Sequence, residues 1–409
     1  MSAIQTAAGR VTSHGAADRL VMPGPALFAA ATIVIAAVYL QAAVSWRQAA
    51  LFLVGVVAGL ALYHAAFGFT SAWRVFISDA RGAGLRAQML MLAVTTAVFF
   101  PLLATGTLLG TPLRGNISPA GISVIVGAFL FGVGMQLGGG CASGTLFTVG
   151  GGNLRMLVTL FFFVVGSVIG TAHVHWWTSL PAVQPVSLLA AMGPLGGLAA
   201  SLALFAAVAA VTIAVERRRH GRLVPDAPPQ PGRRWLQGPW PLVAGALGLA
   251  AVNVATLVLA GRPWGVTSAF ALWGAKAYEA LGGSVASWPY WTAPSQAAAL
   301  KANVVTDVTS VMNAGIVLGA LAAAGLAHRF APRWRVPGRS LAAAVIGGLL
   351  LGYGARLAFG CNIGAYFSGI ASGSLHGWVW LVAGFAGSVA GTRLRPLFGL
   401  TVERTRSGC

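Results

Sequence analysis

The sequence predicts an all-α polytopic membrane protein with about ten transmembrane helices, re-entrant short helices and two inverted repeats. Of its residues, 57% are hydrophobic and 8% are charged, whereas roughly a quarter of the residues in soluble globular proteins are charged. Apolar runs of about 20 residues, long enough to cross roughly 30 Å of hydrocarbon, recur along the chain, and an internal duplication divides them into two halves. The predicted spans are 22–45, 49–66, 87–107, 121–137, 156–173, 187–214, 239–260, 303–326, 340–358 and 376–394.

The duplication is clearest in a glycine-rich segment that surrounds one cysteine in each half. Val126–Gly144 contains Cys141, and Ile346–Gly364 contains Cys361. When the cysteines are aligned, glycines coincide at several positions on both sides of them. The coinciding pairs are Gly127 and Gly347, Gly132 and Gly352, Gly134 and Gly354, Gly140 and Gly360, and Gly144 and Gly364.

A weaker match lies upstream of each cysteine segment. Gly68–Ala72 reads Gly-Phe-Thr-Ser-Ala, and Gly265–Ala269 reads Gly-Val-Thr-Ser-Ala. The match pairs Thr70 with Thr267. Their hydroxyls could contribute to a polar path, or they could bond back to their own helix.

One long polar break separates the halves. It is rich in arginine and proline, so the positive-inside bias places it in the cytoplasm. We therefore expect the following organisation: a cytoplasmic tail at 1–21, a first membrane repeat at 22–215, a basic cytoplasmic linker at 216–238, a second membrane repeat at 239–395 and a cytoplasmic tail at 396–409.

Basic residues change sides between equivalent loops of the two repeats. Loop 108–119 holds one arginine, whereas its partner 328–339 holds four. Stretch 174–186 holds no lysine or arginine, whereas the matching tail is rich in arginine. Because basic loops mark the cytoplasmic side, this reversal predicts that the repeats have inverted topology, as in many transporters.

The formal net charge of +19 could indicate nucleic-acid binding. However, the basic residues lie in short loops and tails between apolar runs, where they set topology. We therefore expect the lipid bilayer and no nucleic acid as a partner. Histidines and cysteines do not cluster at ligand spacing, so neither a metal nor another cofactor is expected.

The glycines beside both cysteines predict breaks in membrane helices. A break survives in hydrocarbon only where protein shields it or where it lines a polar cavity. Exposed N–H groups at helix N-termini would attract an anion there, and a thiol adds a weak donor and a polarizable sulfur. Alternatively, Cys141 and Cys361 are small buried apolar residues, and the glycines serve close helix packing. The symmetric duplication favours a functional role.

Other polar residues are candidates because polar groups are costly in lipid. Asn362 could donate to the same anion as Cys361. Arg356 could supply attractive charge, or its side chain could extend to an interface. Asp307 could couple protons, or it could simply bond to neighbouring hydroxyls. The predicted substrate-binding residues are Cys141, Cys361, Gly140, Gly144, Gly360, Asn362, Gly364, Thr70 and Thr267.

The segments Gly138–Gly144 and Phe359–Gly364, together with the duplication, resemble the YeeE/YedE sulfur-transport family. The resemblance implies an hourglass-like pathway in which short helices and loops meet at a central constriction. It also implies that cysteine S–H groups pass an anion along by hydrogen bonds. By position, Cys141 and Cys361 would be these relay residues.

One segment departs from the family pattern. Members that carry thiosulfate have a further cysteine in a Gly-Phe-Cys segment, and the nearest equivalent here is Gly68-Phe69-Thr70. Threonine donates a hydrogen bond but lacks the softness of sulfur. Another sulfur or selenium species is therefore open beside thiosulfate.

We expect a multi-pass permease of the bacterial inner membrane that imports a small sulfur-containing anion and is not an enzyme. A cytoplasmic sulfur-handling protein is a candidate partner. Two alternatives stay open. One is a membrane thiol oxidoreductase or sulfurtransferase that cycles Cys141 and Cys361, and the other is a membrane protein that does not transport. Energy coupling, oligomeric state and the choice between channel-like relay and alternating access are not determined by the sequence.

Overall fold

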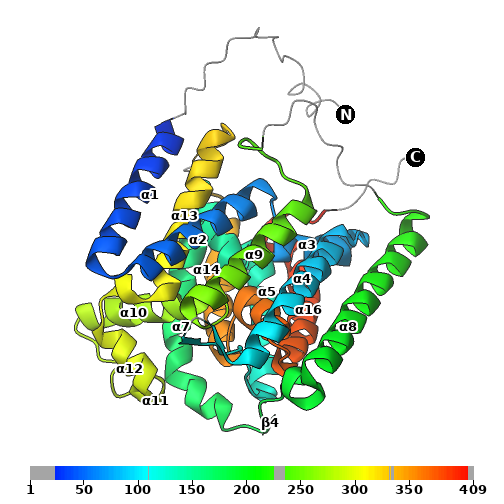
Figure 1. The fold of residues 1–409 in the computed structure, drawn as a ribbon. Helices are drawn as coiled ribbons and strands as arrows, with labels where there is room; N and C mark the ends of the chain where they lie inside the picture. The colour runs from blue at the N-terminus through cyan, green and yellow to red at the C-terminus, as the bar shows by residue number, and fades with distance from the viewer. Residues whose placement is uncertain (1–23, 109, 225–234, 331, 333–335, 404–409) are drawn as a thin grey trace.

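The computed structural model describes residues 24–108, 110–224, 235–330, 332 and 336–403 (Figure 1). The predicted tail at 1–21, the centre of the predicted linker and residues 404–409 lie outside this described part. Within it, nine segments are long and apolar enough to cross a membrane. The all-α polytopic membrane fold predicted from composition is thus confirmed.

Nearly all regular structure is helical. The first helices are α1 (Gly24–Ala43), α2 (Trp46–His64), α3 (Phe69–Asp79), α4 (Ala83–Thr105), α5 (Ile122–Gly138), α6 (Ala142–Gly150), α7 (Leu154–Thr178) and α8 (Leu188–His220). The later ones are α9 (Leu242–Ala260), α10 (Thr267–Ala280), α11 (Pro289–Thr292), α12 (Pro294–Lys301), α13 (Val308–Leu326), α14 (Gly338–Leu357), α15 (Gly369–Ala371) and α16 (Leu375–Leu394).

Short elements connect these helices. Two antiparallel pairs of two-residue strands, β1 (Thr107–Leu108) with β2 (Thr111–Pro112) and β3 (Ala120–Gly121) with β4 (Ala182–Val183), cover one end of the bundle. The remaining turns are the 3₁₀ helices η1 (Val304–Thr306) and η3 (Arg395–Phe398) and the π-helix η2 (Asn362–Ser368).

The packing of the long helices repeats across the two halves. α5 packs against α16, and its sequence equivalent α14 packs against α7, the equivalent of α16. Likewise α1 packs against α13, and α8 packs against α4. The helices thus follow the duplication seen in the sequence, with α5 and α14 at the centre and α1 and α8 at opposite edges (Figure 1).

The two equivalent central helices run antiparallel. A Cβ built on Gly127, near the start of α5, would lie 2.6 Å from the Cβ of Leu357 at the end of α14. Near the end of α5, a Cβ built on Gly138 would lie 3.6 Å from the carbonyl carbon of Gly347, in the first half of α14. Antiparallel packing of equivalent helices is the relation that inverted repeats produce, and it therefore supports the predicted inversion.

Helix breaks occur at both cysteine segments, as predicted. α5 ends at Gly139, whose φ of 94° is left-handed, and α6 begins directly after Cys141. α14 ends before Gly360, whose φ of 146° also favours glycine, and η2 begins directly after Cys361. Each long helix is thus followed by a short buried one.

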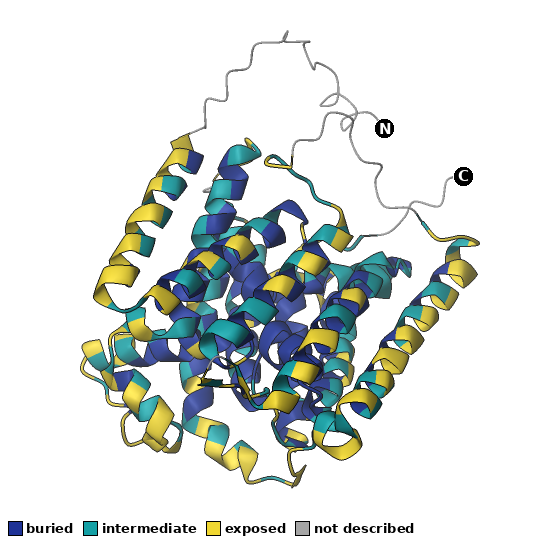
Figure 2. Ribbon diagram, viewed as in Figure 1, coloured by how far each residue is buried: buried dark blue, intermediate teal, exposed yellow. Residues whose placement is uncertain are grey.

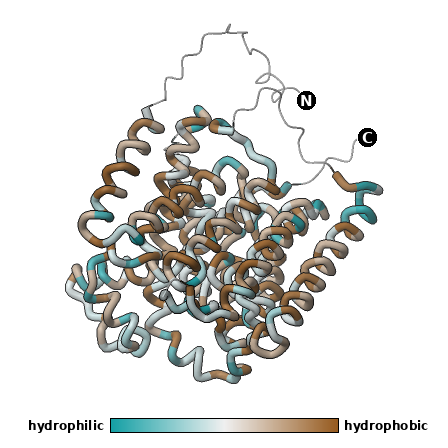
Figure 3. The backbone as a smooth tube through the Cα atoms, in the orientation of Figure 1, coloured by the Kyte–Doolittle hydropathy of each residue, from teal (hydrophilic) through white to brown (hydrophobic). Residues whose placement is uncertain are grey.

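The buried residues concentrate in the helices around α5 and α14, and exposed ones lie on the outer helices (Figure 2). The outer helices are nevertheless apolar (Figure 3). On α1, for example, Val34, Ile35 and Val38 are exposed. An apolar surface of this kind fits a lipid environment.

Three of the predicted segments differ from the observed helices or membrane spans. The predicted span 303–326 becomes a long helix only at Val308, because Asn303 caps the short turn η1 and Asp307 caps α13 itself. α8 continues to His220, inside the predicted linker, where Glu216 accepts hydrogen bonds from Gly82 and Arg86. The last predicted span, 376–394, is α16, which has 20 residues but is not among the nine segments that meet the length and composition criterion.

Candidate functional site

Cys141 caps the N-terminus of the short helix α6. Its Sγ accepts a hydrogen bond from the backbone N–H of Gly144 at 3.4 Å and lies 3.5 Å from the Oγ of Ser143. The residue is buried. The thiol therefore stands at the helix end where backbone N–H groups favour negative charge.

Cys361 takes the equivalent position at the N-terminus of η2 and is fully buried. α6 and η2 contact each other. Both cysteines are free thiols. The structure thus brings the paired cysteine segments together in the interior.

The glycines of the two segments fall into two classes. A Cβ on Gly140 would lie 3.1 Å from the carbonyl carbon of Gly144, and a Cβ on Gly360 would lie 2.8 Å from the nitrogen of Ala365. These two glycines let each short helix fold back closely on the preceding turn. In contrast, the Cβ position of Gly364 is open space.

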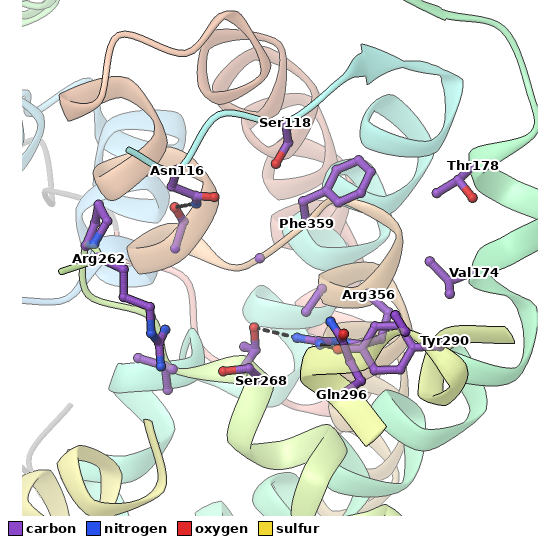
Figure 4. Close-up of a pocket in the computed structure, with 18 of the residues that line it drawn as sticks. Asn116, Ser118, Val174, Thr178, Arg262, Ser268, Tyr290, Gln296, Arg356 and Phe359 are labelled. Atoms are coloured by element: carbon purple, nitrogen blue, oxygen red, sulfur yellow. Dashed lines mark hydrogen bonds between the residues drawn. The ribbon is translucent and has the colours of Figure 1, made fainter. Parts of the chain in front are cut away.

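The open space at Gly364 belongs to a cavity of about 660 Å³, which we call the arginine-lined cavity (Figure 4). Its wall contains Arg114, Arg262 and Arg356, and Gly360 and Gly364 beside Cys361 form part of its floor. No Asp or Glu is among the described residues that line it. A cavity with three cations and no lining acid attracts anions.

A second cavity, of about 210 Å³, lies at the other end of the molecule. It is lined by Gly68, Ser71 and Gln88, and by Ala83 at the start of α4. The chain that follows the end of α4 contributes Arg114 to the arginine-lined cavity, so the two cavities lie at opposite ends of this helix. We call the second one the inner cavity.

Tyr366 connects the Cys361 segment to the inner cavity. Its hydroxyl donates to Oε1 of Gln88 at 3.3 Å, and the indole N–H of Trp73 donates to the same oxygen at 3.0 Å. Tyr366 is fully buried and stacks on Trp380. An aromatic layer with one shared amide thus separates the two cavities.

The paired threonines occupy equivalent places near these cavities. Thr267 lines the arginine-lined cavity, and its Oγ1 accepts a hydrogen bond from Nη2 of Arg356 at 2.9 Å. Thr70 is buried, its carbonyl accepts from Nε2 of Gln136 at 3.2 Å, and its hydroxyl has no partner among the described residues. Neither hydroxyl shows the bond to its own helix that we considered as an alternative.

Two charged candidates have structural partners. Asp307 caps α13, and its Oδ2 accepts from both the backbone N–H and the hydroxyl of Ser310 at 2.7 Å. Hydrogen bonding thus explains this acid. Arg356 is buried rather than extended to an interface, and it donates to Thr267 and to Tyr290.

Several residues of the arginine-lined cavity were not predicted. Arg114 and Asn116 lie in the connection between β2 and β3, and Arg262 lies in the connection between α9 and α10. Asn116 and Arg262 are seen at the cavity in Figure 4. Asn116 Nδ2 donates to the carbonyl of Gly364 at 2.6 Å. The only local sequence signal is that Arg262 closely precedes the repeated motif that begins at Gly265.

Asn362 provides a test of the site that separates function from stability. Its side chain is fully buried, and both its amide nitrogen and its amide oxygen lack a partner among the described residues. Replacing an unpaired buried amide with an apolar group of similar shape is neutral or stabilising. If the amide donates a hydrogen bond to a passing anion, Asn362→Leu should also lower the uptake rate about 10-fold. The melting temperature should not fall.

The matched control is Asn253, which is equally buried but fully engaged. It donates to the hydroxyl of Ser368 at 3.1 Å and accepts from the backbone N–H of Trp264 at 2.8 Å. Asn253→Leu should therefore destabilise the protein by about 1–3 kcal/mol, measured by thermal unfolding in detergent. Normal uptake by Asn362→Leu would remove this residue from the candidate site.

Among the described residues, no group of three or more His, Cys, Asp or Glu side chains could hold a metal ion. The polar groups at the site are instead thiols, amides, hydroxyls and guanidinium groups. All of these can donate hydrogen bonds, which suits an anionic ligand.

Comparison with known proteins points to the same kind of ligand. A family model described as sulphur transport matches residues 64–390. The thiosulfate transporter TsuA of Spirochaeta thermophila is 26% identical over 337 residues, which cover 80% of this chain and 92% of that protein.

Two further relatives match over a shorter part. The probable transporters YedE of Escherichia coli and of Salmonella typhimurium are each 32% identical over 174 residues, which cover 41% of this chain and 42% of each relative. The match therefore spans less than half the length of these two proteins. Because the family model covers most of the sequence, however, the relation is clear: this chain belongs to the sulphur transport family.

Proposed function

We propose that this protein is an inner-membrane permease that imports a small sulfur-containing anion by relay past Cys141 and Cys361. One observation carries the proposal. The two free cysteines stand at the N-termini of two short buried helices that contact each other, and cavities lie at opposite ends of the helices around them. The anion would receive hydrogen bonds from each thiol in turn while it is shielded from lipid.

The charge distribution supports the direction of entry. The inner cavity includes Val224, which lies in the linker that the positive-inside bias places in the cytoplasm. The arginine-lined cavity then faces the periplasm. Three guanidinium groups there would raise the local concentration of anions and speed their capture.

The substrate is proposed to be thiosulfate or a related sulfur or selenium species. The relative from Spirochaeta thermophila, which aligns over most of both chains, is named a thiosulfate transporter. Thr70 belongs to the segment that most nearly matches the Gly-Phe-Cys segment of family members that carry thiosulfate, and its buried hydroxyl is unpaired among the described residues. A hydroxyl donor at that point is compatible with an oxyanion.

Uptake of ³⁵S-labelled thiosulfate tests the proposal in cells that lack their own sulfur-anion transporters. We expect uptake that saturates and that unlabelled thiosulfate inhibits. Sulfate, sulfite, sulfide and selenite, added as competitors, identify the preferred species. Failure to take up any of these species, by protein shown to be in the membrane, would refute the proposed function.

The alternative of a thiol oxidoreductase has less support. Such chemistry needs an accessible, activated thiolate, and both thiols are buried. The relatives are named transporters. Mass spectrometry of the protein after exposure to thiosulfate distinguishes the two functions, because passage leaves both thiols unmodified, whereas group transfer leaves a persulfide or a disulfide.

A further inference from the structure

We propose that Arg356 forms the capture site for a tetrahedral divalent anion at the floor of the arginine-lined cavity. This inference rests on the proposed function and deepens it. It assigns the preference for a dianion to one residue that is separate from the two cysteines.

The contacts of Arg356 indicate a missing negative partner. The residue is only 9% exposed, and its two partners are hydroxyl groups: Nη1 donates to Tyr290 at 3.2 Å, and Nη2 donates to Thr267 at 2.9 Å. Its Nε has no partner among the described residues. Burying a guanidinium group beside neutral partners is costly, and a bound anion would offset that cost.

The surroundings of Arg356 contain further unused donors. Trp264 lines the same cavity and is fully buried, and its indole N–H has no partner among the described residues. Arg114 and Arg262 line the cavity too, but both are exposed to solvent, whereas Arg356 is buried. Among the ion pairs of the described residues, none includes Arg356. Among the three arginines of this cavity, Arg356 is therefore the one whose positive charge a bound anion would stabilise most.

The repeat shows that the charge at this position is a local specialisation. Arg356 and Gln136 precede their cysteines by the same number of residues, and each bonds to the paired threonine of its own side. Nη2 of Arg356 donates to the hydroxyl of Thr267, and Nε2 of Gln136 donates to the backbone carbonyl of Thr70. The same position thus carries a charged side chain in one repeat and a neutral amide in the other.

The geometry favours a tetrahedral dianion as the ligand class. A guanidinium group offers N–H donors in a planar fork that matches two oxygens of one oxyanion, and a second negative charge strengthens each bond. Thiosulfate, sulfate and selenate share this shape and charge. Nitrate and chloride carry one charge and should bind less tightly.

Titration calorimetry on the full chain in detergent, at fixed ionic strength, tests the site. The titrants are thiosulfate, sulfate, selenate, nitrate and chloride. The wild type should bind at least one of the three dianions more tightly than either monoanion. Arg356→Gln should weaken that binding about 10- to 100-fold, because a charge-assisted hydrogen-bond donor is lost. Arg356→Lys keeps the charge without the fork and should lose less.

The matched control is Arg339→Gln, which removes one positive charge from the exposed opposite end of the same helix. It should bind dianions as the wild type does. Without anion, Arg356→Gln should melt no lower than the wild type, since it removes a buried charge that has no counter-ion. If Arg356→Gln does not fold, Arg356→Lys supplies the comparison.

Three results would overturn the inference: wild-type affinity in both Arg356 variants, an equal loss in Arg339→Gln, or no dianion binding by the wild type.

Cys361→Ala separates the inference from the proposed function. This variant should still bind the dianion, because Arg356 is intact, although uptake is lost. If binding depends on Arg356 but uptake does not depend on either cysteine, the relay fails and the capture site stands. If uptake depends on the cysteines but binding ignores Arg356, the capture site fails and the relay stands.

Discussion

Replacement of Cys361 by alanine is expected to reduce uptake of the sulfur anion at least about 100-fold, because a charged substrate in a buried constriction loses the hydrogen bond from this thiol. Cys361 is fully buried at the N-terminus of η2. Cys141→Ala should have an effect of the same order. Cys361→Ser should keep part of the activity, since a hydroxyl also donates but is shorter and less polarizable.

Two controls make this result specific. Cys409 has no equivalent in the other repeat, so Cys409→Ala should transport as the wild type does. Membrane abundance and melting temperature should show that both cysteine variants are folded, because a thiol-to-methyl change in the interior is small. Wild-type uptake by folded Cys141→Ala and Cys361→Ala would show that the anion does not pass the thiols.

The second large effect is on stability. Gly347→Val should prevent the accumulation of folded protein, because a Cβ at this position would overlap the backbone nitrogen of Gly138 and lie 2.6 Å from its Cα and 2.9 Å from the carbonyl oxygen of Gly134. These contacts are backbone atoms of α5, which no rotamer change can move away. Separating α5 from α14 should cost at least about 3 kcal/mol.

Gly338→Ala is the matched control, since it lies at the start of the same helix and no atom lies within 4 Å of its Cβ position. It should fold and melt as the wild type does, or slightly higher, because alanine favours helix. The measurement is the yield of monodisperse protein in detergent, followed by its melting temperature. A Gly347→Val variant with wild-type yield and melting temperature would contradict the close packing of α5 on α14.

Much of the fold could be predicted because its causes are local or repeated. Long apolar runs give the membrane helices, and glycines beside Cys141 and Cys361 give the helix breaks. The reversed arginine bias anticipates the antiparallel packing of equivalent helices, which is visible in the contacts of Gly127 and Gly138. Local signals of this kind predict the structure well, because each acts within one or two helical turns.

The parts that could not be predicted depend on long-range contacts. Asn116 reaches Gly364, and Arg262 donates to Thr309, only because loops fold over the end of the bundle. Lys276 and Glu279 are three residues apart on one helix, a spacing that favours an ion pair. Lys276 donates instead to the carbonyls of Leu300 and Ala302.

The candidate site shows the same division. The equivalence of Cys141 and Cys361 could be recognised in the sequence, because the glycines around them coincide. What the sequence could not reveal is that Arg356 is buried with only neutral partners. Unpaired donors can be recognised only once every neighbouring side chain is in place.

The most direct test of the relay past Cys141 and Cys361 is an experimental structure of the wild-type protein, determined with thiosulfate bound under transport conditions. We predict density for the anion within hydrogen-bonding distance of the Sγ of Cys141, of Cys361, or of both in successive states. Density confined to a surface remote from both sulfurs, or sulfurs turned toward lipid, would contradict a pathway built on these two residues.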